Sequence, residues 1–184
     1  MPNLIIEIGT WKGKSTFQFA QAVKELGLNT KILCIDTWLG GEEHWDLLHP
    51  YRRNGNPIGL YNQFIYNVIH NNYQDIIYPM VQSSAVAYSI LKKYGITAEL
   101  IYVDGSHEEP DVFMDLQLYW DLLEIDGLII GDDFTGSNIT GVDNAVYNFA
   151  QMIDSQIEVF TTVISKDSID QLYRIPAFKF RKEK

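Results

Sequence analysis

Three acidic residues and a histidine follow two short apolar segments of the chain. Asp104 and His107 follow the first segment, and Asp132 and Asp133 end the second, with Asp132 placed 25 residues after His107. This spacing fits one crossover helix, so two parallel strands would end side by side at one edge of a sheet. Carboxylate oxygens suit a hard divalent cation such as Mg²⁺, and an imidazole can take up a proton. The pattern predicts a metal site beside a general base.

Each of these residues also has a common structural use. An aspartate at a strand end is more often a turn former or a helix cap than a ligand. Four such groups at neighbouring strand ends are harder to explain as caps, which favours the functional interpretation. His107 precedes an expected helix start at 108–110, where the positive end of the helix dipole would favour the neutral imidazole that a base requires. The acids nearby would favour the protonated imidazole instead.

A glycine turn follows the apolar segment at residues 4–8. Its pattern is Glu7-x-Gly9-x-x-x-Gly13-x-Ser15. A phosphate-binding P-loop needs four residues between its glycines and this turn has three, while the dinucleotide fingerprint needs glycine where Trp11 stands. The turn lets the backbone approach a ligand closely, although such glycines are often turn chemistry alone.

The apolar segment at residues 31–36 ends in Asp36, 27 residues after Gly9. In nucleotide-binding α/β units an acid at this place typically accepts hydrogen bonds from the ribose hydroxyls. We therefore predict that Asp36 binds a ribose. The alternative is that Asp36 caps the segment that follows it.

Short apolar runs alternate with segments of helical periodicity along the whole chain, which predicts one α/β domain over residues 1–184 with a doubly wound, mostly parallel sheet. Strands are expected at 4–8, 31–36, 76–81, 99–104, 127–132, 156–164 and 171–177, and helices at 14–26, 61–71, 84–94, 110–124 and 139–153. Gly27, Gly95 and Gly127 are expected to end helices in the left-handed conformation.

Residues 38–60 are too long for an ordinary connection between a strand and a helix. The segment contains Trp38, Trp45, Tyr51 and Arg52. Long loops at the carboxyl ends of strands often determine substrate selectivity, so we expect these four residues near a substrate. The alternative is a packed surface loop whose aromatic side chains fix it to the body of the domain.

Composition limits the range of partners. The 184 residues carry a formal charge of −10, which argues against nucleic-acid or anionic-membrane binding and favours a small or neutral substrate. The single cysteine excludes an internal disulfide and a thiolate zinc cluster. No run is apolar enough to span a membrane, and no basic stretch precedes the first strand, so we expect a cytoplasmic protein without a secretion signal.

Taken together, these motifs resemble a known family. The glycine turn Glu7-Ile-Gly-Thr-Trp-Lys-Gly13, the acid Asp36, the run Asp104-Gly-Ser-His107 and the pair Asp132-Asp133 are similar to class I S-adenosylmethionine-dependent methyltransferases. The likeness is greatest to metal-dependent O-methyltransferases of the catechol type and of the macrocin or mycinamicin sugar type. It covers residues 4 to about 150 and implies a Rossmann-like, seven-stranded sheet with an antiparallel last strand.

The resemblance also implies roles for individual residues. The methionine part of S-adenosylmethionine would lie against Glu7, Gly9 and Gly13, with Thr10 and Ser15 near its carboxylate. Asp36 would bind the ribose, and Ser83 and Ser84 would approach the adenine. Relatives commonly have an acid at the position of Ser83, which is a departure here. Asp104, Asp132 and Asp133 match the ligands of Mg²⁺ or a similar divalent cation, and His107 matches the position of a catalytic lysine or histidine.

The acceptor would be a hydroxyl of a small molecule or a glycan, and a histidine rather than a lysine at the base position favours a sugar. A homo-oligomer is compatible with the sequence. Two other functions remain open on the sequence alone. Gly13-Lys14-Ser15 together with Asp132 would suit a nucleotide-dependent phosphotransferase, and a binding module could have kept the fold without the chemistry.

Overall fold

The computed structural model describes residues 1–41, 52–53, 56–57, 59–137, 140–165 and 172–183. Seven strands form one sheet in the order β5-β2-β1-β6-β7-β9-β8. Their bounds are β1 Leu4–Ile8, β2 Lys31–Asp36, β5 Ile77–Val81, β6 Ala98–Val103, β7 Leu123–Gly131, β8 Glu158–Ser165 and β9 Leu172–Arg181. Strands β5, β2, β1, β6 and β7 are parallel, β9 runs antiparallel to β7, and β8 runs antiparallel to β9. This is the Rossmann-like sheet that the sequence predicts.

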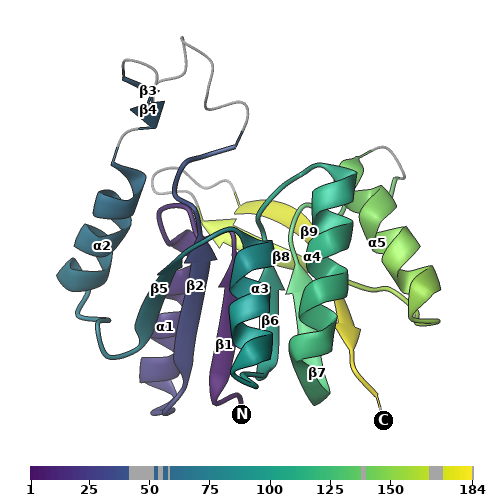
Figure 1. Cartoon of the computed structure of the whole chain (residues 1–184), viewed down its shortest axis with the longest axis horizontal. Helices are drawn as coiled ribbons and strands as arrows, with labels where there is room; N and C mark the ends of the chain where they lie inside the picture. Colours follow the sequence, from purple (N-terminus) through teal and green to yellow (C-terminus); the bar gives the residue numbers. More distant parts are fainter. Residues whose placement is uncertain (42–51, 54–55, 58, 138–139, 166–171, 184) are drawn as a thin grey trace.

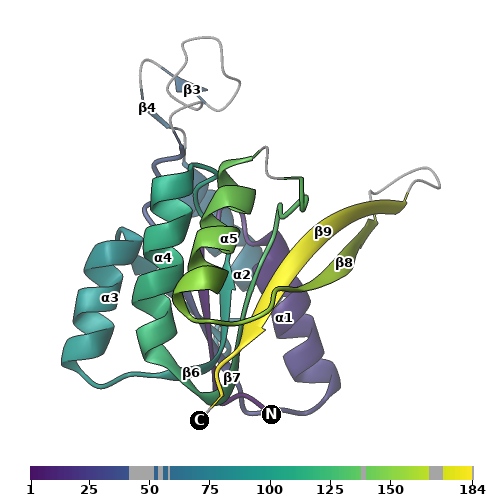
Figure 2. The same ribbon diagram turned by 90° about the vertical axis from the view of Figure 1, so that its right-hand side faces the viewer.

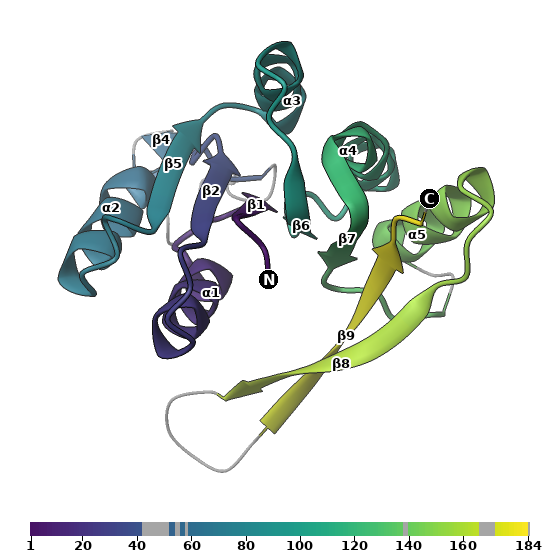
Figure 3. The same ribbon diagram turned by 90° about the horizontal axis from the view of Figure 1, so that it is seen from below.

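In the described part of the chain, five helices cover the two faces of the sheet (Figures 1 and 3). They are α1 Lys14–Glu25, α2 Leu60–His70, α3 Ser84–Lys93, α4 Glu109–Leu122 and α5 Gly141–Met152. Side chains of α1 and α2 form one hydrophobic cluster, and side chains of α3, α4 and α5 form a second, larger one. The result is the three-layer arrangement typical of doubly wound sheets.

The central strands are apolar because helices cover them on both sides. Strand β1 is buried from Ile5 to Ile8, and Ile101 of β6 and Ile129 of β7 are fully buried. Parallel strands in such a position appear as continuous hydrophobic runs rather than as alternating patterns. This physical requirement explains why short apolar runs in the sequence located these strands within a few residues.

The expected helix ends are confirmed at two glycines and wrong at the third. Gly27 and Gly95 follow α1 and α3 with φ angles of +63° and +64°. Gly127 instead lies within β7, which begins at Leu123 directly after α4, and Asp126 has the positive φ of +66°. The helix therefore ends without a glycine, and the Leu123–Gly131 strand is longer than predicted.

Two peripheral features extend from the sheet. Strands β8 and β9 form a long hairpin that projects from the body of the molecule (Figure 2). Within the segment 38–60, β3 (Arg52–Arg53) and β4 (Asn56–Pro57) pair as a short antiparallel ribbon above α2 in Figure 1.

In the part of the chain that the structure describes, no helix has the length and apolar character needed to cross a bilayer.

Candidate active site

The residues with candidate chemistry lie where β1, β6 and β7 end. The strand register aligns Ile8 with Val103 and Val103 with Gly131, so the residues that follow these three strands are neighbours. Gly9, Asp104 and Asp132 are therefore brought to one edge of the sheet. At this edge the parallel strands present their carboxyl ends, where ligands bind in doubly wound sheets.

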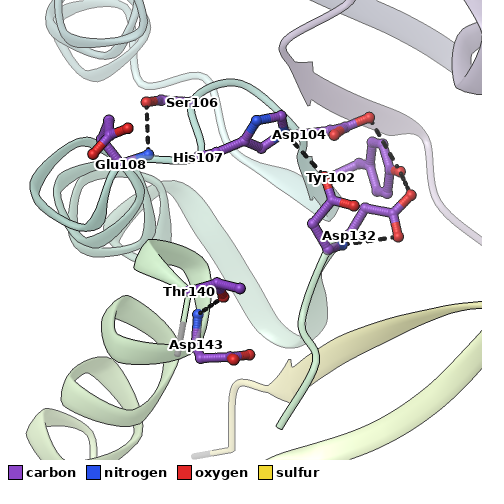
Figure 4. Close-up of polar contacts among 9 residues, drawn as sticks. Tyr102, Asp104, Ser106, His107, Glu108, Asp132, Thr140 and Asp143 are labelled. Atoms are coloured by element: carbon purple, nitrogen blue, oxygen red, sulfur yellow. Dashed lines mark hydrogen bonds and ion pairs between the residues drawn. The ribbon is translucent and has the colours of Figure 1, made fainter. Parts of the chain in front are cut away.

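Three side chains come together closely at this edge, and Figure 4 shows two of them, Asp104 and His107. One ligand atom each from Asp104, His107 and Asp133 lie within 4.8 Å of one another. His107 Nε2 is 3.0 Å from Asp133 Oδ2, and the His107 side chain is 67% exposed. The sequence expected Asp132 as the third ligand beside Asp104 and Asp133, whereas the tight group contains His107 in its place.

Asp132 is linked to the group through a tyrosine. The Tyr102 hydroxyl lies 3.2 Å from Asp132 Oδ2 and 3.4 Å from Asp104 Oδ2, so it can donate its proton to either carboxylate. Asp132 Oδ1 accepts a hydrogen bond from the backbone N–H of Asp133 at 3.0 Å. The sequence analysis missed Tyr102. Its position two residues before Asp104 on the same strand, which puts both side chains on one face, was the available signal.

The electrostatics of the cluster suit a cation. Burial, followed by repulsion from Asp132 and Asp133, raises the pKa of Asp104 to about 8. Burial also raises the pKa of Asp132. A divalent ion would offset the repulsion between these carboxylates, and their oxygens are ligands that Mg²⁺ accepts. The residues present therefore fit a hard divalent cation.

The two glycines of the turn after β1, Gly9 and Gly13, allow close contacts of the backbone. Gly9 has a φ of +82°, and a Cβ added to it would lie 1.9 Å from the carbonyl oxygen of Asp104. Gly13 has a φ of +91° and a Cβ there would lie 2.7 Å from the ring of Phe17. The turn after β1 is thus pressed against the backbone that carries Asp104.

Glu7 and Ser15 contact each other below this turn. Glu7 is fully buried, and its carboxylate accepts hydrogen bonds from Ser15 Oγ at 2.5 Å and from Thr16 Oγ1. Burial raises the pKa of Glu7 to about 7. Thr10 is also buried, at 2% exposure. In this structure Glu7 organises the turn from beneath, and roles of Glu7, Thr10 and Ser15 toward a ligand remain predictions.

Asp36 connects two loops at the end of β2. Its Oδ2 accepts a hydrogen bond from the backbone N–H of Trp11 at 2.7 Å, and its Oδ1 accepts one from the backbone N–H of Trp38, also at 2.7 Å. Trp38 Nε1 donates to the carbonyl oxygen of Trp11 at 2.8 Å. The contact with Trp38, two residues later, supports the structural alternative, in which Asp36 holds the start of the segment that follows it. The ribose contact stays a prediction.

Ser83 and Ser84 begin α3. Ser83 is the N-cap, and its hydroxyl accepts a weak hydrogen bond from the backbone N–H of Val86 at 3.4 Å. The hydroxyl of Ser84 hydrogen-bonds to the Asp115 carboxyl, and its carbonyl oxygen accepts from the Tyr119 hydroxyl at 2.8 Å. These contacts explain both serines structurally, so the adenine contacts remain predictions.

The expectation that Trp38 contacts a substrate is not supported. Trp38 is 4% exposed, and its ring packs against Tyr61 and Phe64 with centroid distances of 5.1 and 5.2 Å. Its ring therefore belongs to the core that attaches the start of the segment 38–60 to α2. Trp45 and Tyr51 lie outside the described residues, and Arg52 is placed only as part of β3.

Sequence comparison identifies the family. A family model described as a methyltransferase domain matches residues 6–134, which include the parallel strands of the sheet except for the first two residues of β1. A curated relative, the uncharacterized protein y4gI of Sinorhizobium fredii, is 30% identical over 117 residues. This match covers 63% of the present chain and only 11% of the relative, so the chain spans about a ninth of that protein's length.

Solved structures share the fold at low sequence identity. An O-methyltransferase from Bacillus cereus in complex with SAH has a TM-score of 0.64 and 14% identity, covering 98% of this chain and 74% of that one. The O-methyltransferase TomG from Streptomyces achromogenes, in complex with SAM, has a TM-score of 0.64 and 13% identity over the same shares of the two chains. The chain belongs to the methyltransferase-domain family, and its fold is that of the class I S-adenosylmethionine-dependent O-methyltransferases.

Proposed function

We propose that this protein transfers a methyl group from S-adenosylmethionine to a hydroxyl oxygen of a small molecule or sugar, assisted by a divalent cation. The observation that carries the proposal is the convergence of Asp104, His107 and Asp133 within 4.8 Å at the carboxyl edge of a methyltransferase sheet. Asp104, Asp132 and Asp133 would hold the cation, and Glu7, Gly9, Thr10, Gly13, Ser15 and Asp36 would surround the methyl donor, with Ser83 and Ser84 nearest the adenine.

The chemistry requires a base and a way to make a hydroxyl acidic. A bound divalent ion lowers the pKa of an acceptor hydroxyl and orients it. His107, which is largely exposed, can accept the hydroxyl proton at the opening of the site. The acceptor oxygen then forms a bond to the methyl carbon while the bond from that carbon to sulfur breaks, which leaves S-adenosylhomocysteine and a protonated His107.

The contacts around His107 support its assignment as the base. His107 precedes α4, whose N-cap is Glu108, so the imidazole stands at the positive end of that helix. Asp133 Oδ2, 3.0 Å from His107 Nε2, orients the ring and stabilises it once it is protonated. A histidine oriented by a carboxylate in this way is a common arrangement for general bases.

The acceptor is proposed from the same site. The formal charge of −10 disfavours nucleic acids and favours a neutral or small acceptor. Within the family that the sequence resembles, a histidine rather than a lysine at the base position favours a sugar acceptor. Titration calorimetry with S-adenosylmethionine and separately with Mg·ATP tests the methyl donor. A methyl-transfer assay over phenol and sugar acceptors, with and without Mg²⁺, then tests the acceptor class. Binding of Mg·ATP without binding of S-adenosylmethionine would instead indicate the phosphotransferase.

We predict that His107→Ala lowers kcat by roughly 10²- to 10⁴-fold and leaves the Kd for S-adenosylmethionine unchanged, because general-base catalysis typically contributes this much. His70→Ala is the matched control, since His70 ends α2 and stacks on Tyr66 away from the carboxylate cluster. Steady-state kinetics and calorimetry measure both quantities. A His107→Ala protein with wild-type kcat would show that another group takes the proton.

A further inference from the structure

Asp143, in the first turn of α5, is a buried carboxylate that no step of the proposed reaction uses. It is fully buried and lies ten residues after Asp133. Charged side chains are rarely fully buried unless they are paired or thoroughly hydrogen-bonded. The partners of Asp143 therefore indicate what it does.

Among the described residues, the Asp143 carboxylate accepts five hydrogen bonds, and all five come from the segment that follows Asp133. Oδ1 accepts from the backbone N–H groups of Thr135 at 2.7 Å and Gly136 at 3.0 Å. Oδ2 accepts from Thr135 Oγ1 at 2.6 Å and from the N–H and hydroxyl of Ser137 at 3.3 and 3.2 Å. Burial alone would raise the pKa of Asp143, but these hydrogen bonds outweigh it and hold the pKa well below its ordinary value.

The segment held by Asp143 needs support. Asp133 has a φ of +59°, a left-handed conformation that is unfavourable for most residues other than glycine, although aspartate adopts it more readily than most. Phe134, the next residue, is 2% exposed and packs against Phe178 with a centroid distance of 6.1 Å. Asp143 then fixes residues 135–137. The strained backbone at Asp133 is thereby held on its C-terminal side by one buried side chain and one carboxylate.

The same helical turn touches the other ligand-bearing loop. A Cβ added to Gly141 would lie 2.4 Å from the carbonyl oxygen of His107 and 2.7 Å from the backbone nitrogen of Glu109. Figure 4 shows Thr140 and Asp143 at the start of α5, next to the segment with His107 and the end of β7 with Asp132. The first turn of α5 thus contacts the loop after β6 through Gly141 and the loop after β7 through Asp143.

We propose that Asp143 is a positioning residue: its carboxylate fixes the 135–137 segment and so keeps Asp132 and Asp133 at the distance from Asp104 and His107 that cation binding requires. This inference rests on the proposed metal-assisted function. Groups that orient metal ligands from behind typically change metal affinity by about 10- to 100-fold when they are removed.

The test compares three variants in two titrations. Binding of Mn²⁺ is monitored by electron paramagnetic resonance, and binding of S-adenosylmethionine is measured by calorimetry. Asp143→Asn keeps the shape of the side chain but replaces one acceptor oxygen with a donor. Gly141→Ala displaces the other loop. Thr140→Ala is the matched control, because the Thr140 hydroxyl caps α5 by accepting from the Asp143 backbone N–H at 3.0 Å without a described contact to residues 135–137.

We expect Asp143→Asn and Gly141→Ala to raise the Kd for Mn²⁺ about 10- to 100-fold, with the Kd for S-adenosylmethionine within about twofold of wild type. Thr140→Ala should destabilise α5 and leave both Kd values close to wild type. Wild-type Mn²⁺ affinity in Asp143→Asn would overturn the inference while leaving the proposed function intact. The inference would also be overturned, in favour of general destabilisation, if Asp143→Asn weakened the binding of Mn²⁺ and S-adenosylmethionine equally. The same holds if Thr140→Ala raised the Kd for Mn²⁺ as much as Asp143→Asn does. A wild-type protein that binds no Mn²⁺ would remove the metal-assisted function and this inference with it.

Discussion

Glu7 is a fully buried acid whose ionisation opposes folding. Its pKa is raised from an ordinary value of 4.5 to about 7 because burial penalises the charged form more than the hydroxyls of Ser15 and Thr16 stabilise it. The folded protein therefore retains the proton over a pH range in which the unfolded chain has lost it. Between pH 4.5 and about 7 the unfolding free energy should fall as the pH rises, and above that range the contribution of Glu7 is constant.

We predict that Glu7→Gln removes this pH dependence and is more stable than wild type at pH 8, by at most about 3 kcal/mol, because the glutamine cannot ionise. Urea unfolding at pH 5 and pH 8 measures the difference. Glu25→Gln is the control, since Glu25 is an exposed residue at the end of α1 whose carboxylate accepts from Gln21. A Glu7→Gln protein with the wild-type slope would mean that Glu7 is ionised in the fold throughout this range.

At the scale of elements, the turn between β1 and α1 joins the two halves of the candidate site. Gly9 lies against the backbone of Asp104 and Gly105, so the turn after β1 and the loop after β6 share one backbone contact. The backbone N–H of Asp104 also donates to the carbonyl oxygen of Ile8 at 2.8 Å. A displacement of either loop is therefore transmitted directly to the other.

We predict that Gly9→Ala lowers the unfolding free energy by roughly 2–4 kcal/mol, because left-handed strain adds to a clash with rigid backbone. Gly27→Ala is the matched control. Gly27 has a φ of +63°, but nothing lies within 4 Å of the position of an added Cβ. It should cost only about 1 kcal/mol of strain. Urea unfolding compares the two variants, and equal losses would show that the contact with Asp104 contributes nothing.

For the whole molecule, the dominant electrostatic property is excess negative charge. A formal charge of −10 destabilises the compact state through repulsion. At the candidate site, burial and repulsion from Asp132 and Asp133 raise the pKa of Asp104, so a cation bound there would favour the ionised carboxylates. Salt screens the repulsion between surface charges, with a Debye length of about 10 Å at 0.1 M ionic strength. A cation bound between the carboxylates would instead reduce the repulsion within the candidate site.

We predict that NaCl raises the Tm modestly and that MgCl₂ at the same ionic strength raises it further, because only a bound ion adds a free energy of binding to the folded state. At a concentration of 100 times the Kd, binding would add about 2.7 kcal/mol. Differential scanning calorimetry in matched solutions measures the shift. Identical Tm values in the two salts would contradict a specific cation site.

Local patterns in the sequence were sufficient for the elements and for the position of the candidate site. The buried strands appear as apolar runs because helices cover both of their faces, and the order of strands and helices fixes which ends share an edge. The proximity of Asp104, His107 and Asp133 follows from that order. The expected helix at 110–124 agrees with α4 within two residues at each end, but the assignment of Gly127 to a helix end was wrong. Gly127 lies inside β7, where strand pairing overrides local preference.

Contacts between side chains distant in sequence were decided only in three dimensions. From the sequence we expected Trp38 to lie in a loop near a substrate, whereas in the structure its ring packs against Phe64 of α2 in the core. Tyr102 and Asp143 carry no motif, and their relation to the carboxylates depends on how β6, β7 and α5 meet. The sequence alone predicted the family, through the resemblance of its motifs, and it predicted the sheet and the edge at which the acids gather, because these follow from periodicity and strand order. The tertiary structure decided which groups contact and orient one another, because burial and hydrogen bonding depend on packing between elements.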